Sequence, residues 1–314
     1  MKLIKLDDIK RALKGVNLPY IIEEGFRAYS TGNAVIPPVG ELLFDDPTGE
    51  VHIKYGYLKG DAFYVVKIAS GFYDNVSLGV PSSSGLMLVF SARTGEPLAL
   101  LQDEGYLTDL RTAVAGGIAA KYLAPREVRR IGIVGTGTQA RLQLLELKRY
   151  TECKDVLYWG RDESRAAAYK RDMEEEGFSL RLALDPKEIA MTCNLIVTTT
   201  PSKEPLIMAR DVMVGTHITA VGSDSLGKQE LDERLLARAE RLVVDSLSQA
   251  KERGELAHAL SANLVLEGSA TELGHIIAGE HSGRTSEKQI TVADLTGVAV
   301  QDIQVATAVY ERLS

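Results

Sequence analysis

A glycine-rich loop between a predicted strand and a predicted helix constrains the fold of this chain most strongly. The apolar run 128–134 is typical of a buried parallel strand, and it leads into Gly-Thr-Gly-Thr-Gln-Ala at 135–140. Apolar residues then recur at roughly helical spacing as far as Tyr150. The alternative is a purely structural turn, but these flanks favour a Rossmann domain whose helix amino terminus and glycine backbone approach a pyrophosphate.

Length and composition restrict the class of protein. The 314 residues are enough for two domains, and 45% hydrophobic with 25% charged residues is typical of a soluble globular protein. The net charge of −7, without a block of Lys or Arg, argues against nucleic acid or an anionic membrane as a partner. No apolar run approaches the roughly 20 residues that span a bilayer, and the amino terminus is charged where a signal peptide is apolar. Cys153 and Cys193 form no metal or redox spacing, so we expect a cytoplasmic protein without a metal, with both cysteines in the core.

Strand and helix signals alternate after about residue 127. Predicted strands cover 155–159, 194–198, 216–221 and 241–245. A helix is predicted over 162–176 with Asp162 as its cap, and another opens at Asp185-Pro186. This alternation predicts an α/β fold, a doubly wound parallel sheet with helices on both faces.

The first 115 residues have a different pattern. Helices are predicted over 7–13 and 20–30, and a hairpin turn over 94–96 lies between two of several strand-like runs. A small-residue helix over 110–123 suits close packing at a domain junction, and 301–313 is an amphipathic helix whose domain the sequence alone does not assign. The strand-like runs are 50–58, 62–69, 85–91 and 97–102, which predict a separate α+β domain with an antiparallel or mixed sheet.

Three further segments point to one family. They are Tyr-Val-Val-Lys-Ile at 64–68, Leu-Arg-Thr-Ala at 110–113 and Val-Gly-Ser-Asp-Ser-Leu-Gly-Lys-Gln-Glu-Leu-Asp at 221–232. Together with the glycine loop they closely resemble the ornithine cyclodeaminase/mu-crystallin family, over nearly the whole chain. The resemblance implies a substrate-binding and dimerisation domain of residues 1–115 plus about 295–314, an NAD(P)-binding Rossmann domain of 116–294, and a homodimer.

The family's members share one kind of chemistry. They include ornithine and lysine cyclodeaminases, an alanine dehydrogenase and reductases of cyclic imino acids. The resemblance implies that this chain moves a hydride between a nicotinamide and the α-carbon of an amino or imino acid.

Lys67 and Arg111 are the candidate substrate-binding residues. Lys67 lies inside an apolar strand-like run, where a lysine must be paired or have a shifted pKa. Alternation along the strand favours the other reading, a lysine that faces solvent, whereas the resemblance places the family's substrate-binding and catalytic lysine here. Arg111 is either a surface salt-bridge residue or, as the resemblance implies, a bidentate clamp on the substrate carboxylate.

Asp224 is the candidate catalytic acid/base. It follows a predicted Rossmann strand at the carboxyl end, where ligands bind in such sheets, although Gly-Ser-Asp at 222–224 is also turn-like. The resemblance aligns Asp224 with the proton-transferring aspartate of the cyclodeaminases, which mu-crystallins lack. Lys228 is either a solvated charge or a cofactor contact.

One departure from the family pattern concerns the substrate. Family members usually carry a Pro-Arg sequence after the amino-terminal helices, but residues 35–39 read Val-Ile-Pro-Pro-Val. Lys54 could replace the missing arginine. The departure puts ornithine in doubt as the substrate.

The second predicted Rossmann strand bears on the cofactor. It ends Trp-Gly-Arg-Asp at 159–162, so Gly160 stands where an NAD-preferring domain has an acid, and Arg161 could meet a 2′-phosphate. We therefore expect NADP(H) to be preferred, with NAD(H) possible. By resemblance the cofactor contacts are Ser83, Arg111, Thr112, Gly135, Thr136, Gly137, Thr138, Gln139, Ala140, Gly160, Arg161, Thr199, Thr200, Val221, Gly222, Ser223, Lys228 and Thr296, with Gly297 at the substrate.

The leading hypothesis is reduction of Δ1-pyrroline-2-carboxylate or Δ1-piperideine-2-carboxylate to proline or pipecolate. The runner-up is ornithine cyclodeaminase, which recycles its NAD and releases ammonia. Alanine dehydrogenase is third, and a non-catalytic ligand carrier like mu-crystallin is the alternative outside enzymes. No motif fixes ring size or reaction direction.

Overall fold

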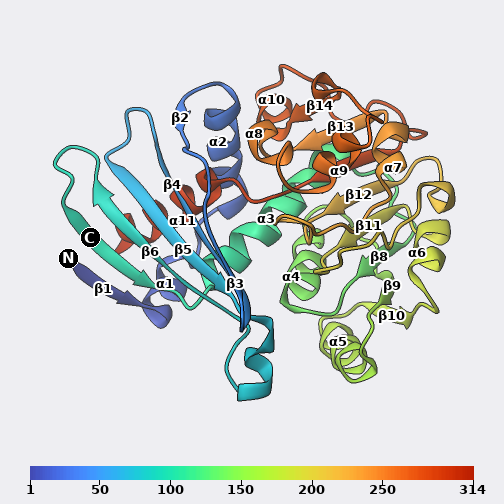
Figure 1. Ribbon diagram of the computed structural model, residues 1–314, viewed down its shortest axis with the longest axis horizontal. Helices are drawn as coiled ribbons and strands as arrows, with labels where there is room; N and C mark the ends of the chain where they lie inside the picture. The colour runs from blue at the N-terminus through green and yellow to red at the C-terminus, as the bar shows by residue number, and fades with distance from the viewer. The chain divides into compact units, whose positions relative to one another are not determined.

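The computed structural model describes residues 1–314, apart from the side chains of Tyr73 and Val76. The chain forms two compact units, Met1–Arg111 with Val298–Ser314 and Thr112–Gly297. Each unit has its own sheet (Figure 1). Within the described residues, no helix combines the length and apolar character needed to cross a membrane.

The first unit contains a seven-stranded mixed sheet in the order β1-β7-β6-β5-β4-β2, with β3 paired to β4. The β1 strand runs parallel to β7, and the other pairs are antiparallel, as the predicted hairpins require. The strands are β1 (Lys2–Lys5), β2 (Ala34–Val35), β3 (Gly40–Asp45), β4 (Thr48–Leu58), β5 (Phe63–Gly71), β6 (Ser83–Ser91) and β7 (Pro97–Gln102).

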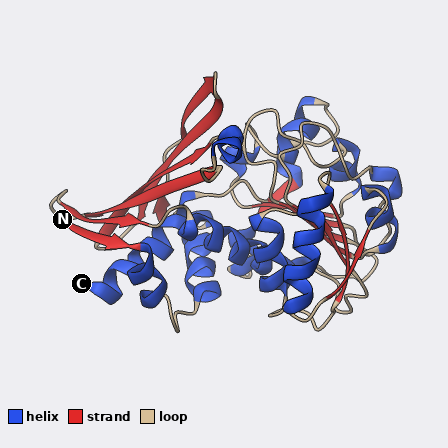
Figure 2. Ribbon diagram, turned by 90° about the horizontal axis from the view of Figure 1, so that it is seen from below, coloured by secondary structure: helices blue, strands red, loops and turns tan.

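The carboxyl-terminal helix belongs to this unit and packs on one face of its sheet, against β4, β5 and β6 (Figure 2). It also packs against α2, where Gly25 permits close approach: a Cβ there would lie 2.9 Å from Gln304 Cγ. Asn17 caps α2 by accepting from the Tyr20 amide. The helical elements are α1 (Leu6–Ala12), α2 (Leu18–Ser30), η1 (Tyr73–Leu78) and α11 (Ala299–Leu313).

The two faces of this sheet differ in burial. On the face that packs against α11, Lys54, Lys67, Met87 and Leu101 lie side by side across four strands, and all four are buried. On the opposite face the apolar residues keep part of their surface accessible. Neighbouring residues on that face are Ile53, Ile68 and Leu86, then Tyr55, Val66, Leu88 and Leu100, then Tyr64 and Phe90, whose rings stack.

The second unit contains an eight-stranded sheet in the order β10-β9-β8-β11-β12-β15-β13-β14, and every pair is parallel. The direction of chain progression reverses between β8 and β11, which is the switch point of a doubly wound fold. The predicted Rossmann sheet is therefore confirmed. The strands are β8 (Ile131–Val134), β9 (Asp155–Trp159), β10 (Ser179–Leu182), β11 (Leu195–Thr198), β12 (His217–Ala220), β13 (Arg241–Val244), β14 (Ala270–Glu272) and β15 (Thr291–Asp294).

Helices follow the strands of this unit. The predicted caps Asp162 and Asp185 are confirmed, since their carboxylates accept from the amides of Arg165 and Glu188. The small-residue helix α3 packs tightly on α4, because a Cβ on Gly116 would lie 2.0 Å from Gln143 Oε1. The helices are α3 (Tyr106–Leu123), which carries the unit boundary, α4 (Thr138–Leu147), α5 (Glu163–Glu175), α6 (Pro186–Thr192), η2 (Ala209–Asp211), α7 (Glu233–Arg238), α8 (Leu247–Ala250), α9 (Glu255–Ser261), η3 (Glu267–Ser269) and α10 (Leu273–Ile277).

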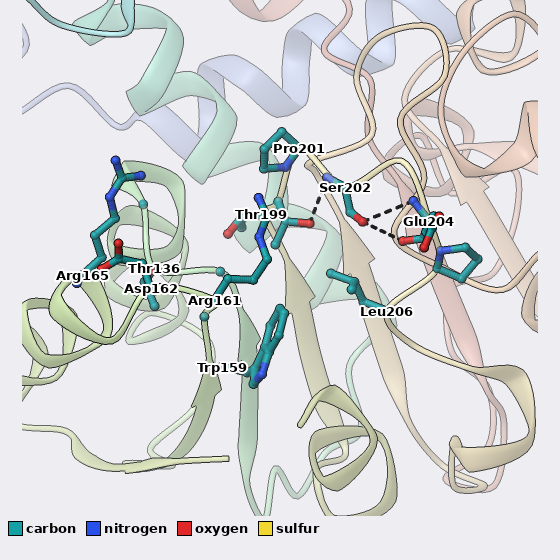
Figure 3. A pocket seen from close by; sticks show the side chains of 15 residues that line it. Thr136, Trp159, Arg161, Asp162, Arg165, Thr199, Pro201, Ser202, Glu204 and Leu206 are labelled. Atoms are coloured by element: carbon teal, nitrogen blue, oxygen red, sulfur yellow. Dashed lines mark hydrogen bonds between the residues drawn. The ribbon is translucent and has the colours of Figure 1, made fainter. Parts of the chain in front are cut away.

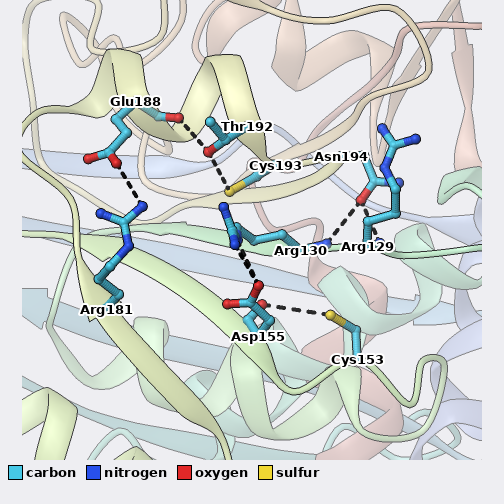
Figure 4. A network of polar contacts seen from close by, with 9 residues as sticks. All are labelled: Arg129, Arg130, Cys153, Asp155, Arg181, Glu188, Thr192, Cys193 and Asn194. Carbon is cyan, nitrogen blue, oxygen red and sulfur yellow. Dashed lines mark hydrogen bonds and ion pairs between the residues drawn. The ribbon is translucent and has the colours of Figure 1, made fainter.

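Polar contacts tie together the segments at the amino ends of β8, β9 and β11 (Figure 4). Arg130 pairs with Asp155 at 2.8 Å, and the Asn194 side chain accepts from the Arg129 amide. Cys193 is buried, and burial raises the pKa of its thiol to about 12, whereas Cys153 is partly exposed. The network lies at the end of the strands opposite the glycine loop, and we assign it a structural role.

Candidate active site

The glycine loop has the backbone geometry that the motif predicts. Gly135 follows β8 with φ of +121°, and a Cβ there would lie 2.4 Å from Thr199 Oγ1, so a larger residue would be strained and crowded. Gly137 precedes the first turn of α4, and a Cβ there would meet no atom within 4 Å. Ala140 is fully buried in the core with Ile131 and Ile133, which permits close packing of α4 on the sheet.

A cavity of about 440 Å³ opens at the carboxyl ends of β8, β9 and β11 (Figure 3). Its volume is within the range of small-molecule sites, and it lies at the switch point of the sheet. The predicted cofactor residues that line it are Gly135, Thr136, Gly137, Gly160, Arg161, Thr199 and Thr200. The cavity therefore lies where the glycine loop predicts a dinucleotide.

Other lining residues were missed by sequence reasoning. They are Trp159, Asp162, Arg165, Pro201, Ser202, Glu204, Pro205 and Leu206. Arg165 could have been found, since it lies in the first turn of α5, four residues after Arg161. Two guanidinium groups thus line the cavity close to the end of β9, while the Asp162 carboxylate is occupied as the cap of α5.

Gly160 leaves little room for an acidic side chain. A Cβ at this position would lie 2.6 Å from Thr136 Cγ2 and 2.9 Å from its hydroxyl. Any side chain at 160 would therefore require the Thr136 side chain to move. The carboxylate that binds a ribose 2′-hydroxyl in NAD-preferring domains cannot be supplied from this position without that movement.

The loop after β12 holds Asp224 and Lys228 together. Lys228 Nζ donates to Asp224 Oδ1 at 2.8 Å, and Ser225 Oγ donates to the same oxygen at 3.1 Å. The loop is closed by Ser223, whose hydroxyl donates to the Lys228 carbonyl at 2.6 Å. The Asp224 side chain is 44% exposed, so its carboxylate is accessible to a ligand.

The remaining predicted cofactor and substrate residues lie elsewhere in their units. Thr138, Gln139, Ala140, Val221, Gly222, Ser223 and Lys228 are not among the described residues that line the cavity. The Thr296 and Gly297 amides donate to the buried Asp245 carboxylate at 3.1 and 2.6 Å. The Thr112 carbonyl accepts from Gln143, and Ser83 is exposed at the start of β6. Their predicted roles stay predictions.

A buried charge cluster lies in the first unit. Lys67 Nζ is 3.1 Å from Asp302 Oδ2, and Arg111 Nε is 3.0 Å from Asp302 Oδ1. Arg111 also donates to the Gln301 side chain at 2.9 Å. Lys54 is the cross-strand neighbour of Lys67 and is 6% exposed, so the three predicted substrate-binding cations gather around one carboxylate. The solvent-facing interpretation of Lys67 that alternation favours is wrong, because this lysine is only 2% exposed.

The cations of this cluster repel one another. Burial lowers the pKa of Lys67 to about 7; Asp302 opposes this, while Arg111 and Lys54 add to it. Burial alone would raise the pKa of Asp302, but Arg111, Lys67 and Lys54 together lower it, so Asp302 is ionised. Lys67 is therefore only partly protonated near neutral pH. A carboxylate ligand beside Lys67 would raise its pKa and favour the ammonium form.

Comparison with known proteins assigns the family. The ornithine cyclodeaminase/mu-crystallin family model matches residues 3–314. An uncharacterized cyclodeaminase from Sinorhizobium fredii is 43% identical over 293 residues, which cover 92% of this chain and 88% of the relative.

Two solved structures are similar over nearly the whole chain. An archaeal alanine dehydrogenase dimer with bound NAD is 36% identical, with a TM-score of 0.91 and coverage of 99% of this chain and 95% of that one. The Δ1-pyrroline-2-carboxylate reductase of Thermococcus litoralis, in complex with NADH and L-proline, is 27% identical, with a TM-score of 0.92 and coverage of 99% and 97%. The chain therefore belongs to the ornithine cyclodeaminase/mu-crystallin family and is an enzyme that acts on amino or imino acids.

Proposed function

We propose that this enzyme reduces a cyclic imino acid, Δ1-pyrroline-2-carboxylate or Δ1-piperideine-2-carboxylate, to L-proline or L-pipecolate. The observation that carries the proposal is the buried cluster of Lys54, Lys67 and Arg111 around Asp302. Arg111 and Lys54 both act to lower the pKa of Lys67, so the buried cations repel one another, and an anionic ligand bound among them would relieve that repulsion. A monocarboxylate with one ring nitrogen matches this requirement.

Each candidate residue has one task in this reaction. Arg111 and Lys67 hold the substrate carboxylate, and Lys54 adds positive charge beside them. A bound nicotinamide would supply the hydride to the imine carbon. Asp224, whose carboxylate accepts from the Lys228 ammonium, takes up a proton from that ammonium or from solvent and passes it to the imine nitrogen. The hydride and the proton together convert the C=N bond into CH–NH.

The cofactor proposal is NADP(H) in preference to NAD(H). Arg161 and Arg165 line the cavity near the end of β9, Gly160 carries no carboxylate, and Asp162 is occupied as a helix cap. Guanidinium groups are the usual partners of a 2′-phosphate. The two solved relatives carry NAD and NADH, so NAD(H) is the alternative that the assay must include.

The charge of the substrate separates the competing reactions. Ornithine carries a second ammonium group, which the cations Lys54, Lys67 and Arg111 would repel, so the cyclodeaminase reaction is less well supported. Alanine dehydrogenase is the second candidate, because the archaeal alanine dehydrogenase shares more identity with this chain than the pyrroline carboxylate reductase does, 36% against 27%. Its imino acid is also a monocarboxylate.

We further propose that the chain forms a homodimer through the partly accessible apolar face of its first sheet. The face is continuous over β4, β5 and β6, and apolar areas of this kind mark interaction surfaces. The archaeal alanine dehydrogenase is described as a dimer, which supports the proposal.

A substrate panel tests the proposed reaction. Each cyclic imino acid, pyruvate with ammonia, and L-ornithine is offered with NADPH and with NADH, and nicotinamide absorbance is followed. We expect the highest kcat/KM for a cyclic imino acid with NADPH. A higher value for pyruvate with ammonia would establish alanine dehydrogenase instead. Proline and ammonia formed from ornithine without net change of the nicotinamide would establish a cyclodeaminase.

A further inference from the structure

Glu230 is a fully buried carboxylate that joins the ends of two Rossmann strands. Its Oε1 accepts from the Thr200 amide at 2.5 Å and from the Thr200 hydroxyl at 2.8 Å. Its Oε2 accepts from the Thr198 hydroxyl at 2.7 Å and from the Gly222 amide at 2.9 Å. Each carboxylate oxygen thus faces one backbone N–H, which cannot reverse its direction, and one hydroxyl, which can rotate.

The groups bonded to Glu230 belong to the wall of the nucleotide cavity and to the loop that carries Asp224. Thr200 and Leu206 line the cavity, and the Leu206 amide donates to the Glu230 carbonyl at 2.7 Å. A Cβ on Gly222 would lie 2.2 Å from the Thr200 carbonyl oxygen, so the two loops are in direct contact. Glu230 therefore fixes the cavity wall through both its main chain and its side chain.

Two more buried carboxyl groups stand behind Glu230. Glu255 accepts from the amides of Glu230 and Leu231 at 2.8 and 3.1 Å, and Asp294 accepts from the Leu256 amide at 2.8 Å. Burial raises the pKa of Glu230 to about 7, although its hydrogen bonds oppose the rise. Burial also raises the pKa of Asp294 to about 7 and that of Glu255 well above its usual value, and the three groups repel one another.

We propose that Glu230 is a positioning residue for the cofactor: its carboxylate must be ionised for the cavity wall to hold its binding conformation. A proton on either oxygen would remove the charge that strengthens all four hydrogen bonds, and the hydroxyl beside it, of Thr198 or of Thr200, would have to rotate from donor to acceptor. Nucleotide affinity then depends on the proton occupancy of a group that does not line the cavity. This inference rests on the proposed binding of a nicotinamide nucleotide there.

The direction of the pH dependence follows from the ionised form. Glu230 is ionised above a pH of about 7 and protonated below it. Affinity for the nucleotide is therefore constant above this pH and falls by up to about tenfold per pH unit below it. Glu230 and Glu255 interact with Asp294, and so does Asp245. The midpoint of the affinity change therefore describes these coupled carboxyl groups together, and a Glu230 variant is needed to assign it to Glu230.

The test is a titration of the full-length protein with NADPH and NADH, by calorimetry or nicotinamide fluorescence, from pH about 5.5 to about 8.5. In Glu230→Gln the amide NH₂ must face one backbone N–H at every pH. We expect Glu230→Gln to bind the nucleotide about 10- to 100-fold more weakly than wild type at high pH. Its affinity should show no pH dependence near neutrality. In Thr198→Val one donor to the ionised carboxylate is lost, so the midpoint moves up by about one pH unit.

Control variants separate positioning from folding. Glu272→Gln changes another buried carboxylate of the same unit, which accepts from the Leu247 amide, and it should keep the wild-type affinity and pH profile. Wild-type affinity and pH dependence in Glu230→Gln would overturn the inference and leave the proposed function intact. Should Glu230→Gln not fold, an unchanged midpoint in Thr198→Val would overturn it as well. Failure of the wild-type protein to bind either nucleotide at any pH would refute the proposed function itself.

Discussion

Replacement of Lys67 by methionine gives the most direct test of the buried charge cluster, because it requires no substrate. The Lys67 pKa falls from 10.5 to about 7 on folding. Between these values the unfolded chain binds a proton at this lysine and the folded chain does not, so wild type loses stability as the pH falls from 10.5 towards about 7. The full effect is about 5 kcal/mol, at about 1.4 kcal/mol per pH unit.

The measurable quantity is the difference in unfolding free energy between wild type and Lys67→Met. Methionine has similar volume and does not titrate, so this difference should shift against wild type by about 2 kcal/mol between pH about 9 and about 7. Urea denaturation at both pH values, without ligand, measures it. Lys14→Met, at an exposed position, should show no such shift. A constant difference for Lys67→Met would mean that Lys67 keeps its ordinary pKa, and the argument that burial and the neighbouring cations deprotonate Lys67 would fail.

Three other predictions concern the cofactor, the proton and the assembly. Arg161→Ala should weaken NADPH binding by about 10- to 100-fold and NADH binding much less, and equal losses would remove Arg161 from the 2′ site. Asp224→Asn should lower kcat by about 10²- to 10⁴-fold while cofactor affinity stays near wild type, whereas Arg111→Ala should mainly raise KM; wild-type turnover in Asp224→Asn would leave Asp224 as a turn residue. Leu88→Lys, on the apolar sheet face, should convert a homodimer into a monomer by light scattering, and a monomeric wild type at micromolar concentration would refute the dimer.

The local sequence predicted the Rossmann sheet because its signals are local. A buried apolar run, a glycine turn and capping aspartates at 162 and 185 are all read within one strand–helix unit. Two of the strands that were missed contain few buried residues. Lys2–Lys5 has one buried residue and pairs in parallel with β7, and Gly40–Asp45 has none and forms a hairpin with β4. Neither pairing leaves a periodic pattern in the sequence.

The candidate site was predictable in part for the same reason. Lys67 and Arg111 lie in recognisable segments, but strand alternation alone favoured the wrong side for Lys67. Asp302 was missed, although it is an acid on the buried stripe of α11, three residues after Ala299 and four before Ala306. Glu230 has no comparable signal, since the groups that bind its carboxylate come from Thr198, Thr200 and Gly222.

Lys67 and Glu230 must be in opposite protonation states for activity, and together they predict the pH profile of the reaction. Lys67 must be protonated to hold a carboxylate, which requires a pH below about 7, and Glu230 must be ionised to hold the cavity wall, which requires a pH above about 7. At the optimum each group is then in its active form in about half of the molecules, so kcat/KM should be bell-shaped and reach roughly a quarter of its limiting value.

Substrate and cofactor each stabilise the active form of one group. The profile of kcat should therefore be broader than that of kcat/KM. Lys67→Arg should remove the alkaline limb, because a guanidinium stays charged, and Glu230→Gln should remove the acid limb. A profile whose limbs both persist in these variants would show that neither cluster controls the reaction.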